Sequence, residues 1–406
     1  MSRRAGVLWL AALAGCAGLP GAKQAPTFRD DLAFLDKHTD AFVLSDEAGE
    51  AHVVVVPQYQ GRVMTSTAGG PEGLSFGWIN RELIASGRRL EQMNPFGGED
   101  RMWLGPEGGQ FSIFFPQGAS REFKFEDWQT PEAIDWGPWE LVERSPTHAR
   151  FRKKMTLTNF SGTTFDLMAD RTVRLLGPAD VEKHFGLRLP EEVDAVAFES
   201  DNRITNTGKK AWTKDKGLLS IWILCMFTPS PSTTVVIPYV EGPEAKLGPV
   251  VNDAYFGEIP PDRLKIEEGV IYFKCDGKKR GKLGLSPQRA KPIMGSYDAA
   301  HQVLTLATYT KPQGTTDYVN SMWEIQEHPY GGDVVNSYND GPTPAGPPLG
   351  PFYELESSSP AAALEPGETL RHVHRTLHVT GPANALDPLA RQALGVSIAE
   401  IKSAFQ

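Results

Sequence analysis

Short apolar segments, many of them alternating with polar residues, run through most of the chain and predict strands rather than helices. In "ARFRKKMTLTN", Phe151 and Met155 fall on one face of such a strand, whereas Arg152 and Lys154 fall on the other. Gly, Pro, Asn and Ser separate these segments, and no helical pattern is interleaved between them. The pattern therefore predicts a mainly β fold, in the form of a large sandwich or barrel of antiparallel strands.

Helical spacing is confined to the two ends of this strand-rich region. Residues 28–39, "FRDDLAFLDKHT", have the pattern of a short amphipathic helix. The tail has apolar residues at helical intervals, namely Leu386, Leu389, Leu394, Ile398 and Ile401. Because no linker-like composition divides the middle of the chain, we predict one sandwich domain over residues 29–382 and a helical cap over residues 383–406.

The N-terminus has the features of an export signal. Arg3 and Arg4 precede an apolar run over residues 7–14, which is too short to span a bilayer. The run ends in "LAGC", which resembles the bacterial lipobox, with Cys16 as the lipid-modified residue. We predict a signal peptide over residues 1–15, then the lipidated cysteine and a linker over 16–28, and hence a protein anchored in the bacterial cell envelope. An ordinary secretory peptide that contains a cysteine is the alternative.

Composition limits the classes of partner. The 406-residue chain has a formal net charge of −9, which argues against nucleic acid because phosphate binding needs clustered Lys and Arg. The one basic run, residues 278–280, is flanked by glycine, and we interpret it as a solvated hairpin tip. Cys225 and Cys275 lie in apolar runs, where we expect buried thiols, with a disulfide between them as the alternative.

Two acidic, glycine-rich segments are the main candidates for chemistry. Residues 94–111 and 328–342 each place a carboxylate directly after Gly-Gly and keep aromatic residues close by. Sugar sites combine hydrogen-bonding carboxylates and amides with aromatic faces, whereas a simple turn needs only a few such residues. The candidate ligand-binding residues in these segments are Asn94, Arg101, Trp103, Glu107, Asp333, Asn336 and Asp340.

Acidic and histidine residues near the C-terminus suggest further possibilities. Glu354 and Glu356 share one face of a predicted strand, and His372, His374 and His378 share one face of another. We expect the histidines to form hydrogen bonds in the core, with a metal site as the alternative. Calcium is a second alternative, because the Asp/Asn loop that follows residue 332 offers hard oxygen ligands. We therefore name no metal ligand and no cofactor.

The order of four segments resembles the galactose mutarotase-like superfamily. The segments are "GRVMTSTA", "NPFGGEDRMWLGPEGG", "RITNTGKKAW…SIWILCMF" and "YELESSSP…LEPGETLRHVHRTLHV". Within the superfamily, the chain most closely resembles an uncharacterised family of exported bacterial proteins. The resemblance covers most of residues 30–380 and implies a β-supersandwich, with a broad concave sheet that binds a sugar.

The resemblance also assigns roles to individual residues. Glu356 matches the general base of aldose 1-epimerases, although two serines replace the Pro-Gln that follows it there. Arg62 matches a substrate-binding arginine on the early Gly-Arg strand. The acid histidine of those enzymes should fall near residues 220–227, where this chain has no histidine. His328, from the second glycine-rich loop, is then the best available acid.

These observations lead to a hypothesis with two alternatives. The protein is expected to be an envelope lipoprotein that binds a carbohydrate and acts on it by carboxylate acid/base chemistry of epimerase, hydrolase or lyase type. The first alternative is a lipoprotein that binds carbohydrate without catalysis. The second is a structural envelope protein, in which the two glycine-rich loops would lie far apart and line no pocket.

Overall fold

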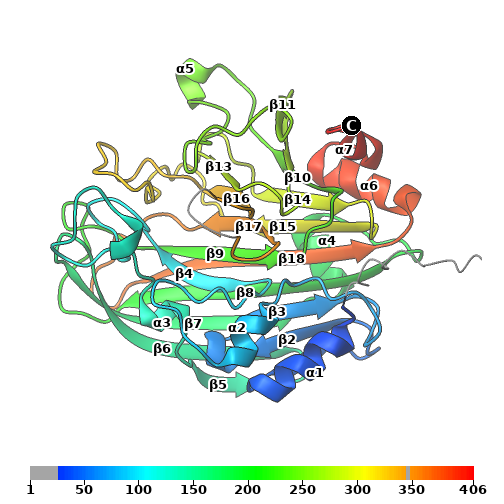
Figure 1. Cartoon of the computed structure of the whole chain (residues 1–406), viewed down its shortest axis with the longest axis horizontal. Coiled ribbons are helices and arrows are strands. Elements are labelled where there is room, and N and C mark those ends of the chain that lie inside the picture. The colour runs from blue at the N-terminus through cyan, green and yellow to red at the C-terminus, as the bar shows by residue number, and fades with distance from the viewer. Residues whose placement is uncertain (1–25, 344–347) are drawn as a thin grey trace, which may run out of the picture.

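Three antiparallel sheets make up most of the structure (Figure 1). The computed structural model describes residues 26–343 and 348–406. Strands dominate it and the helices are short, so the prediction of a mainly β fold is confirmed. Cys16 and the predicted signal peptide lie outside the described residues.

The largest sheet has ten strands and forms one layer of a sandwich. On β6, the apolar residues Phe151 and Met155 are buried, whereas Lys154 is exposed, as their alternation predicts. The strands, in spatial order, are β11 (Leu264–Glu267), β12 (Val270–Lys274), β10 (Thr233–Pro238), β14 (Ile293–Asp298), β15 (Val303–Tyr309), β18 (Thr369–Thr380), β8 (Asp194–Asn206), β7 (Thr164–Leu175), β6 (His148–Thr158) and β5 (Glu140–Arg144).

A five-stranded sheet packs against the middle of the ten-stranded sheet. Its inner face contributes Leu355, Ile223 and other apolar residues to the main hydrophobic core. The Tyr353 hydroxyl also lies 2.8 Å from the Ser296 hydroxyl of the facing sheet. In spatial order its strands are β13 (Gly281–Leu285), β16 (Val335–Asn339), β17 (Tyr353–Ser358), β9 (Ser220–Phe227) and β4 (Arg101–Gly105).

The third sheet extends the layer formed by the five-stranded sheet and is built from N-terminal strands. It consists of β1 (Phe42–Ser45), β2 (His52–Val56) and β3 (Arg62–Thr67), and a bridge between Val63 and Asp100 links β3 to the segment before β4. Helices α1 (Phe28–His38) and α2 (Arg81–Ser86) cover its outer face with a small apolar cluster (Figure 1).

The C-terminal tail covers part of the outer face of the ten-stranded sheet. It forms two helices, α6 (Ala383–Leu394) and α7 (Ile398–Ser403), separated at Gly395, whose φ of 81° ends the first. Their apolar residues join α4 (Pro178–Phe185) in a second core over β10, β14 and β15. No helix in the described ranges is long and apolar enough to cross a bilayer. The remaining short helices are η1 (Pro57–Tyr59), η2 (Phe125–Asp127), α3 (Glu132–Asp135) and α5 (Glu244–Leu247).

The predicted hairpin around residues 278–280 was wrong. β12 belongs to the ten-stranded sheet and β13 to the five-stranded sheet, so the basic run connects the two layers. Two apolar segments joined by a turn have the sequence pattern of a hairpin. The pattern does not show which strands pair, because the choice of partner strand depends on distant segments. The three basic residues are exposed, as expected for this turn.

A buried ion pair connects the two layers. The Arg171 guanidinium on β7 donates to the Asp100 carboxylate at 2.6 Å, and neither side chain is exposed. Arg171 also bonds to Asn202, and Ser200 donates to Asp100. Because each charged group has several hydrogen-bond partners, neither is left buried with unsatisfied polar atoms, which would be costly.

The three histidines of β18 continue this polar contact between the layers. The Ser357 hydroxyl on β17 lies 2.9 Å from His372 Nε2 and 2.8 Å from His374 Nδ1. Burial lowers the pKa of His372 to about 3 and that of His374 to about 4. His378 lies 3.0 Å from the buried Glu99 carboxylate. All three histidines thus bond to groups of the facing layer.

The two cysteines are also inside the structure. Cys225 and Cys275 are buried free thiols, as expected, and the alternative disulfide is not formed. The Cys225 sulfur lies 3.5 Å from His374 Nε2, so it takes part in the same polar contact.

Neutral His372 and His374 should make the fold sensitive to acid. Unfolded histidines titrate near pH 6.5, so their stabilisation is complete above that pH and is lost as pH falls towards the folded values. As the pH falls from about 7.5 to about 5, we expect each of the two neutral histidines to lower the free energy of unfolding by on the order of 2 kcal/mol. Urea denaturation of the wild type and His372→Gln should show a smaller acid loss in the variant. His328→Gln, at an exposed histidine, is the control, and equal acid losses in all three proteins would contradict the assignment.

Candidate functional site

Strand alternation gathers polar and aromatic side chains on the outer face of the five-stranded sheet. Tyr353, Leu355 and Ser357 point into the sandwich, so Glu354 and Glu356 point outwards. Cross-strand pairing places their outward neighbours on the adjacent strands. These neighbours are Lys282 on β13, Asn336 and Tyr338 on β16, Trp222 and Leu224 on β9, and Arg101 and Trp103 on β4.

Glu356 lies at the centre of this face. One carboxylate oxygen, Oε2, accepts hydrogen bonds from Trp222 Nε1 at 2.8 Å and from Lys282 Nζ at 2.9 Å. The Lys282 ammonium lies 4.7 Å from the Trp222 ring centroid and 5.5 Å from that of Tyr255. The two donors hold the carboxylate in one orientation, and the aromatic rings hold the cation.

Glu354 forms a second buried pair beside the first. It accepts a bond of 2.9 Å from Arg101, whose guanidinium lies 4.4 Å from the Trp103 ring centroid. Burial raises the pKa of Glu354 to about 7, with a further contribution from the negative charge of Glu356, although Arg101 acts in the opposite direction.

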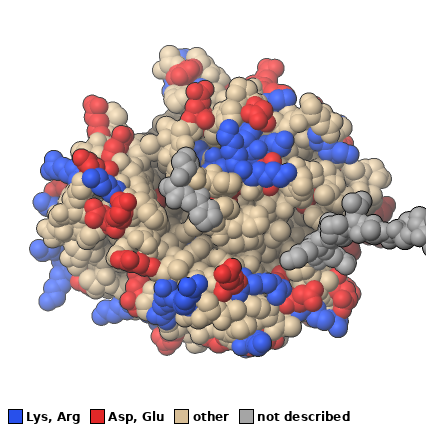
Figure 2. Space-filling model, in the orientation of Figure 1, with Lys and Arg blue, Asp and Glu red and all other residues tan. Residues whose placement is uncertain are grey.

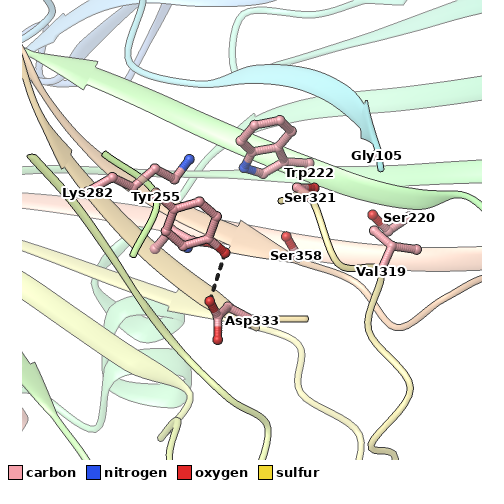
Figure 3. Close-up of a pocket in the computed structure, with 10 residues that line it drawn as sticks. Gly105, Ser220, Trp222, Tyr255, Lys282, Val319, Ser321, Asp333 and Ser358 are labelled. Carbon is pink, nitrogen blue, oxygen red and sulfur yellow. Dashed lines mark hydrogen bonds between the residues drawn. The ribbon is translucent and has the colours of Figure 1, made fainter. Parts of the chain in front are cut away.

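A small cavity opens next to Lys282 (Figure 3). The Tyr255 hydroxyl reaches across it and donates to Asp333 Oδ2 at 2.8 Å, and Asn252 donates to the same oxygen at 3.0 Å. Burial raises the pKa of Asp333 to about 6. The lining residues are Gly105, Ser220, Trp222, Tyr255, Lys282, Val319, Ser321, Asp333, Asn336 and Ser358.

Glu107, in the loop after β4, belongs to the same group of charges. Its backbone N–H donates to the Ser321 hydroxyl at 3.1 Å, which ties this loop to a cavity-lining residue. Burial raises the pKa of Glu107, and the negative charge of Glu356 adds to the rise, whereas Lys282 lowers it. Lys282 also lowers the pKa of Asp333. Three predicted carboxyls therefore lie around one ammonium group.

Several buried polar atoms on this face lack a hydrogen-bond partner within the described residues. They are Glu356 Oε1, Arg101 Nε and Nη1, Trp103 Nε1 and Ser220 Oγ. Buried polar atoms in folded proteins are normally satisfied by protein, ordered water or a ligand. The surface is hollowed beside β4, β9 and β17, as the space-filling view shows (Figure 2). These atoms therefore need a partner that the described residues do not supply.

Three other predicted residues stabilise loops instead of lining the cavity. Arg62 is fully buried and donates to the Gly97 carbonyl at 2.9 Å, and burial lowers its pKa to about 9. Asn94 donates to Asp135 at 2.6 Å. Asp340 accepts from the Tyr338 hydroxyl and from the backbone of residue 350, each at 2.9 Å. Their polar groups are used in holding the segments that border the site.

His328, the predicted acid, is exposed in a turn and forms no hydrogen bond or ion pair with Glu356 in the described part of the chain. Sequence reasoning did not single out two cavity residues, Lys282 and Tyr255. Lys282 lies two residues beyond the basic run, and its strand alternation was the one signal that separated it from the exposed lysines. Tyr255 stands in an irregular loop with no periodic pattern.

The histidines and the acidic loop use their polar groups in hydrogen bonds within the described chain. Within residues 26–343 and 348–406, no group of three His, Cys, Asp or Glu side chains is arranged to hold an ion. Both ring nitrogens of His372 bond to hydroxyl groups, from Thr310 and Ser357. Asp333 and Asp340, the calcium candidates, accept hydrogen bonds from separate tyrosines.

The packed layers define a galactose mutarotase-like β-supersandwich. A candidate aldose 1-epimerase of Escherichia coli K12 aligns with a TM-score of 0.50 and 13% identity, over 84% of this chain and 99% of that one. The Slr1438 protein of Synechocystis sp. PCC 6803 aligns with a TM-score of 0.49 and 14% identity, over 85% of this chain and 96% of that one. A galactose mutarotase-like protein of Lactobacillus casei ATCC 334 aligns with a TM-score of 0.47 and 10% identity, over 83% of this chain and 99% of that one. The Escherichia coli match, at 13% identity, supports the fold and not the reaction.

The chain belongs to the family of unknown function DUF6786, whose sequence pattern matches residues 26–405. The predicted resemblance to an uncharacterised family of the mutarotase-like fold is thereby confirmed. No curated protein matches the sequence.

The Lys282–Glu356 pair should be costly to break from one side. Lys282→Met leaves Glu356 buried without its cation, and we expect a loss of about 3 kcal/mol in unfolding free energy by urea denaturation. The double variant Lys282→Met, Glu356→Leu removes both charges and should be more stable than the single variant. Lys279→Met, at an exposed lysine, should change stability by less than about 0.5 kcal/mol. A double variant that is no more stable than Lys282→Met would argue against a buried charge pair.

Proposed function

We propose that the protein binds a carbohydrate on the outer face of the five-stranded sheet and moves protons on that sugar with Glu356 as base. The observation that carries the proposal is the unused Oε1 of Glu356, which is buried on the same sheet face as unpartnered donors of Arg101 and Trp103. A ligand that offers both hydroxyl donors and oxygen acceptors would satisfy these atoms together. Sugars have this combination.

The arrangement around Glu356 suits a general base. Trp222 and Lys282 both donate to one oxygen, Oε2, which leaves Oε1 as a free acceptor for a hydroxyl proton. Glu107 suits the role of acid, because its raised pKa favours a carboxyl that holds its proton. It takes the role that the sequence assigned to His328.

Ring opening of an aldose needs this pair of groups. The base removes the proton of the anomeric hydroxyl, the C1–O5 bond breaks as C1 becomes a carbonyl, and the acid protonates the ring oxygen. Reclosure on the other face of the carbonyl returns both protons and inverts the anomeric centre. Asp333 and Asn336 hold hydroxyls at the cavity, while Trp222 and Tyr255 offer aromatic faces to the ring.

The proposal also places the protein in the bacterial cell envelope. Its support is the N-terminal sequence, in which a short apolar run ends in the lipobox-like Cys16. A lipid on that cysteine would hold the folded domain at a membrane surface, facing the periplasm or the exterior.

A carbohydrate-binding protein without catalysis is the second candidate. Trp222 occupies the strand to which the resemblance assigns the acid histidine, and its ring nitrogen anchors Glu356 instead of donating a proton to a substrate. In that case the same face would hold the sugar, and Glu356 would act only as a hydrogen-bond acceptor.

Screening residues 23–406 against mono- and oligosaccharides tests both candidates. Thermal shift reports binding, and NMR of the anomeric protons reports exchange or cleavage. We expect one sugar class to stabilise the wild type and to react, and Glu356→Gln to slow that reaction by about 10²- to 10⁴-fold. Glu365→Gln, at an exposed glutamate in a nearby turn, is the matched control and should react like the wild type.

The outcomes separate the alternatives. Binding without reaction by any variant favours the non-catalytic protein. A reaction that Glu356→Gln leaves unchanged would sink the assignment of the base. Absence of any stabilising sugar would contradict the carbohydrate proposal as a whole.

A further inference from the structure

A basic run borders the candidate site. Lys278, Lys279 and Arg280 are exposed in the connection that leads into β13. The backbone of this run packs against the end of β16, since Asn339 donates to the Lys279 carbonyl at 2.8 Å. Lys and Arg side chains gather on one rim of the hollow in the space-filling view (Figure 2).

Arg280 is held in place by aromatic rings. Its guanidinium carbon lies 3.6 Å from the Phe256 ring centroid and 5.9 Å from that of Tyr338. Phe256 packs edge-on against Tyr338 at 5.9 Å and is still 47% exposed. An exposed ring and an oriented guanidinium therefore form one platform.

The charge of Arg280 has no acidic partner among the described residues. Asp276, the acid nearest to it along the chain, pairs with Arg263. By contrast, Arg101 on the same sheet face has a carboxylate partner, Glu354. Arg280 and the two lysines therefore give this rim a positive charge that nothing in the described chain neutralises.

The rim is continuous with the interior of the site. Arg280 and Lys282 share one face of the chain entering β13, about 7 Å apart. The positive charge of Arg280 also lowers the pKa of Glu107, so the two groups lie within electrostatic range. One turn supplies both aromatic rings, with Tyr255 in the cavity and Phe256 on the rim.

We propose that Phe256 and Arg280 form an outer subsite for a sugar unit that carries an anionic group, a carboxylate, sulfate or phosphate. The inference rests on the proposed carbohydrate site and names the class of its ligand. In the inner site both cations are already paired, Lys282 with Glu356 and Arg101 with Glu354, so no unpaired cation is left there for an anion and a neutral unit occupies it. The acidic unit then stacks on Phe256 and pairs with Arg280.

Calorimetric titration of paired ligands tests this subsite. The probes are short oligomers of galacturonic, glucuronic and mannuronic acid, each beside its methyl ester, and sulfated and phosphorylated disaccharides beside the unmodified sugars. We expect the wild type to bind one anionic probe about tenfold more tightly than its neutral counterpart at low salt, with a smaller difference in 0.5 M salt. The preferred pair identifies which anion is recognised.

Variants assign the preference to the rim. Arg280→Gln should abolish most of it and leave binding of the neutral member unchanged, whereas Phe256→Ala should weaken both members. Arg188→Gln removes the same charge from an exposed position on the chain and should behave like the wild type. Circular dichroism checks that each variant is folded.

The results distinguish failure of the anionic subsite from failure of the carbohydrate site. Equal binding of acidic and neutral partners, or a preference that Arg280→Gln preserves, overturns the anionic subsite and leaves the carbohydrate site standing. Absence of binding by every probe overturns both.

Discussion

The register of β17 is the constraint on which the rest of the site depends. Its inward residue Ser357 bonds to His372 and His374 of the facing sheet, and this contact decides which residues point the other way. A shift of one residue would turn Glu354 and Glu356 into the core and expose the residues that now fill it. The buried polar contact between the layers therefore positions the outer carboxylates, although it touches no ligand.

The outer face resolves the problem of burying several charges by pairing each with a cation from another strand. Arg101 reaches Glu354 from β4, and Lys282 reaches Glu356 from β13. Such pairs add little net stability compared with apolar residues, but breaking one from a single side is costly. Stability alone therefore does not explain why the sheet retains these pairs, because an apolar surface of the same size would be at least as stable.

Local pattern was enough to predict the strands, their alternation and the common face of Glu354 and Glu356, because these follow from residues that are near in sequence. It did not reveal that Lys282 binds Glu356, since that contact needs β13 to pair with β16 and not with β12. For the same reason the basic run was taken for a hairpin. Arg62 and Asn94 had suitable chemistry for a ligand, but their hydrogen bonds go to loop segments that no periodicity describes.

The position of Trp222 bears on which group could protonate the ring oxygen in the proposed reaction. The sheet holds Glu356 with a lysine and an indole, so the strands supply a base and no free acid beside it. Glu354, the strand carboxyl with a raised pKa, is paired with Arg101, whereas Glu107 and Asp333, whose pKa values are also raised, stand on loops beside the cavity. Loops adjust more readily than paired strands. A rigid base on the sheet and acids on adjustable loops would let one fold keep its proton acceptor while the loops, together with the rim at Arg280, determine which sugar is accepted.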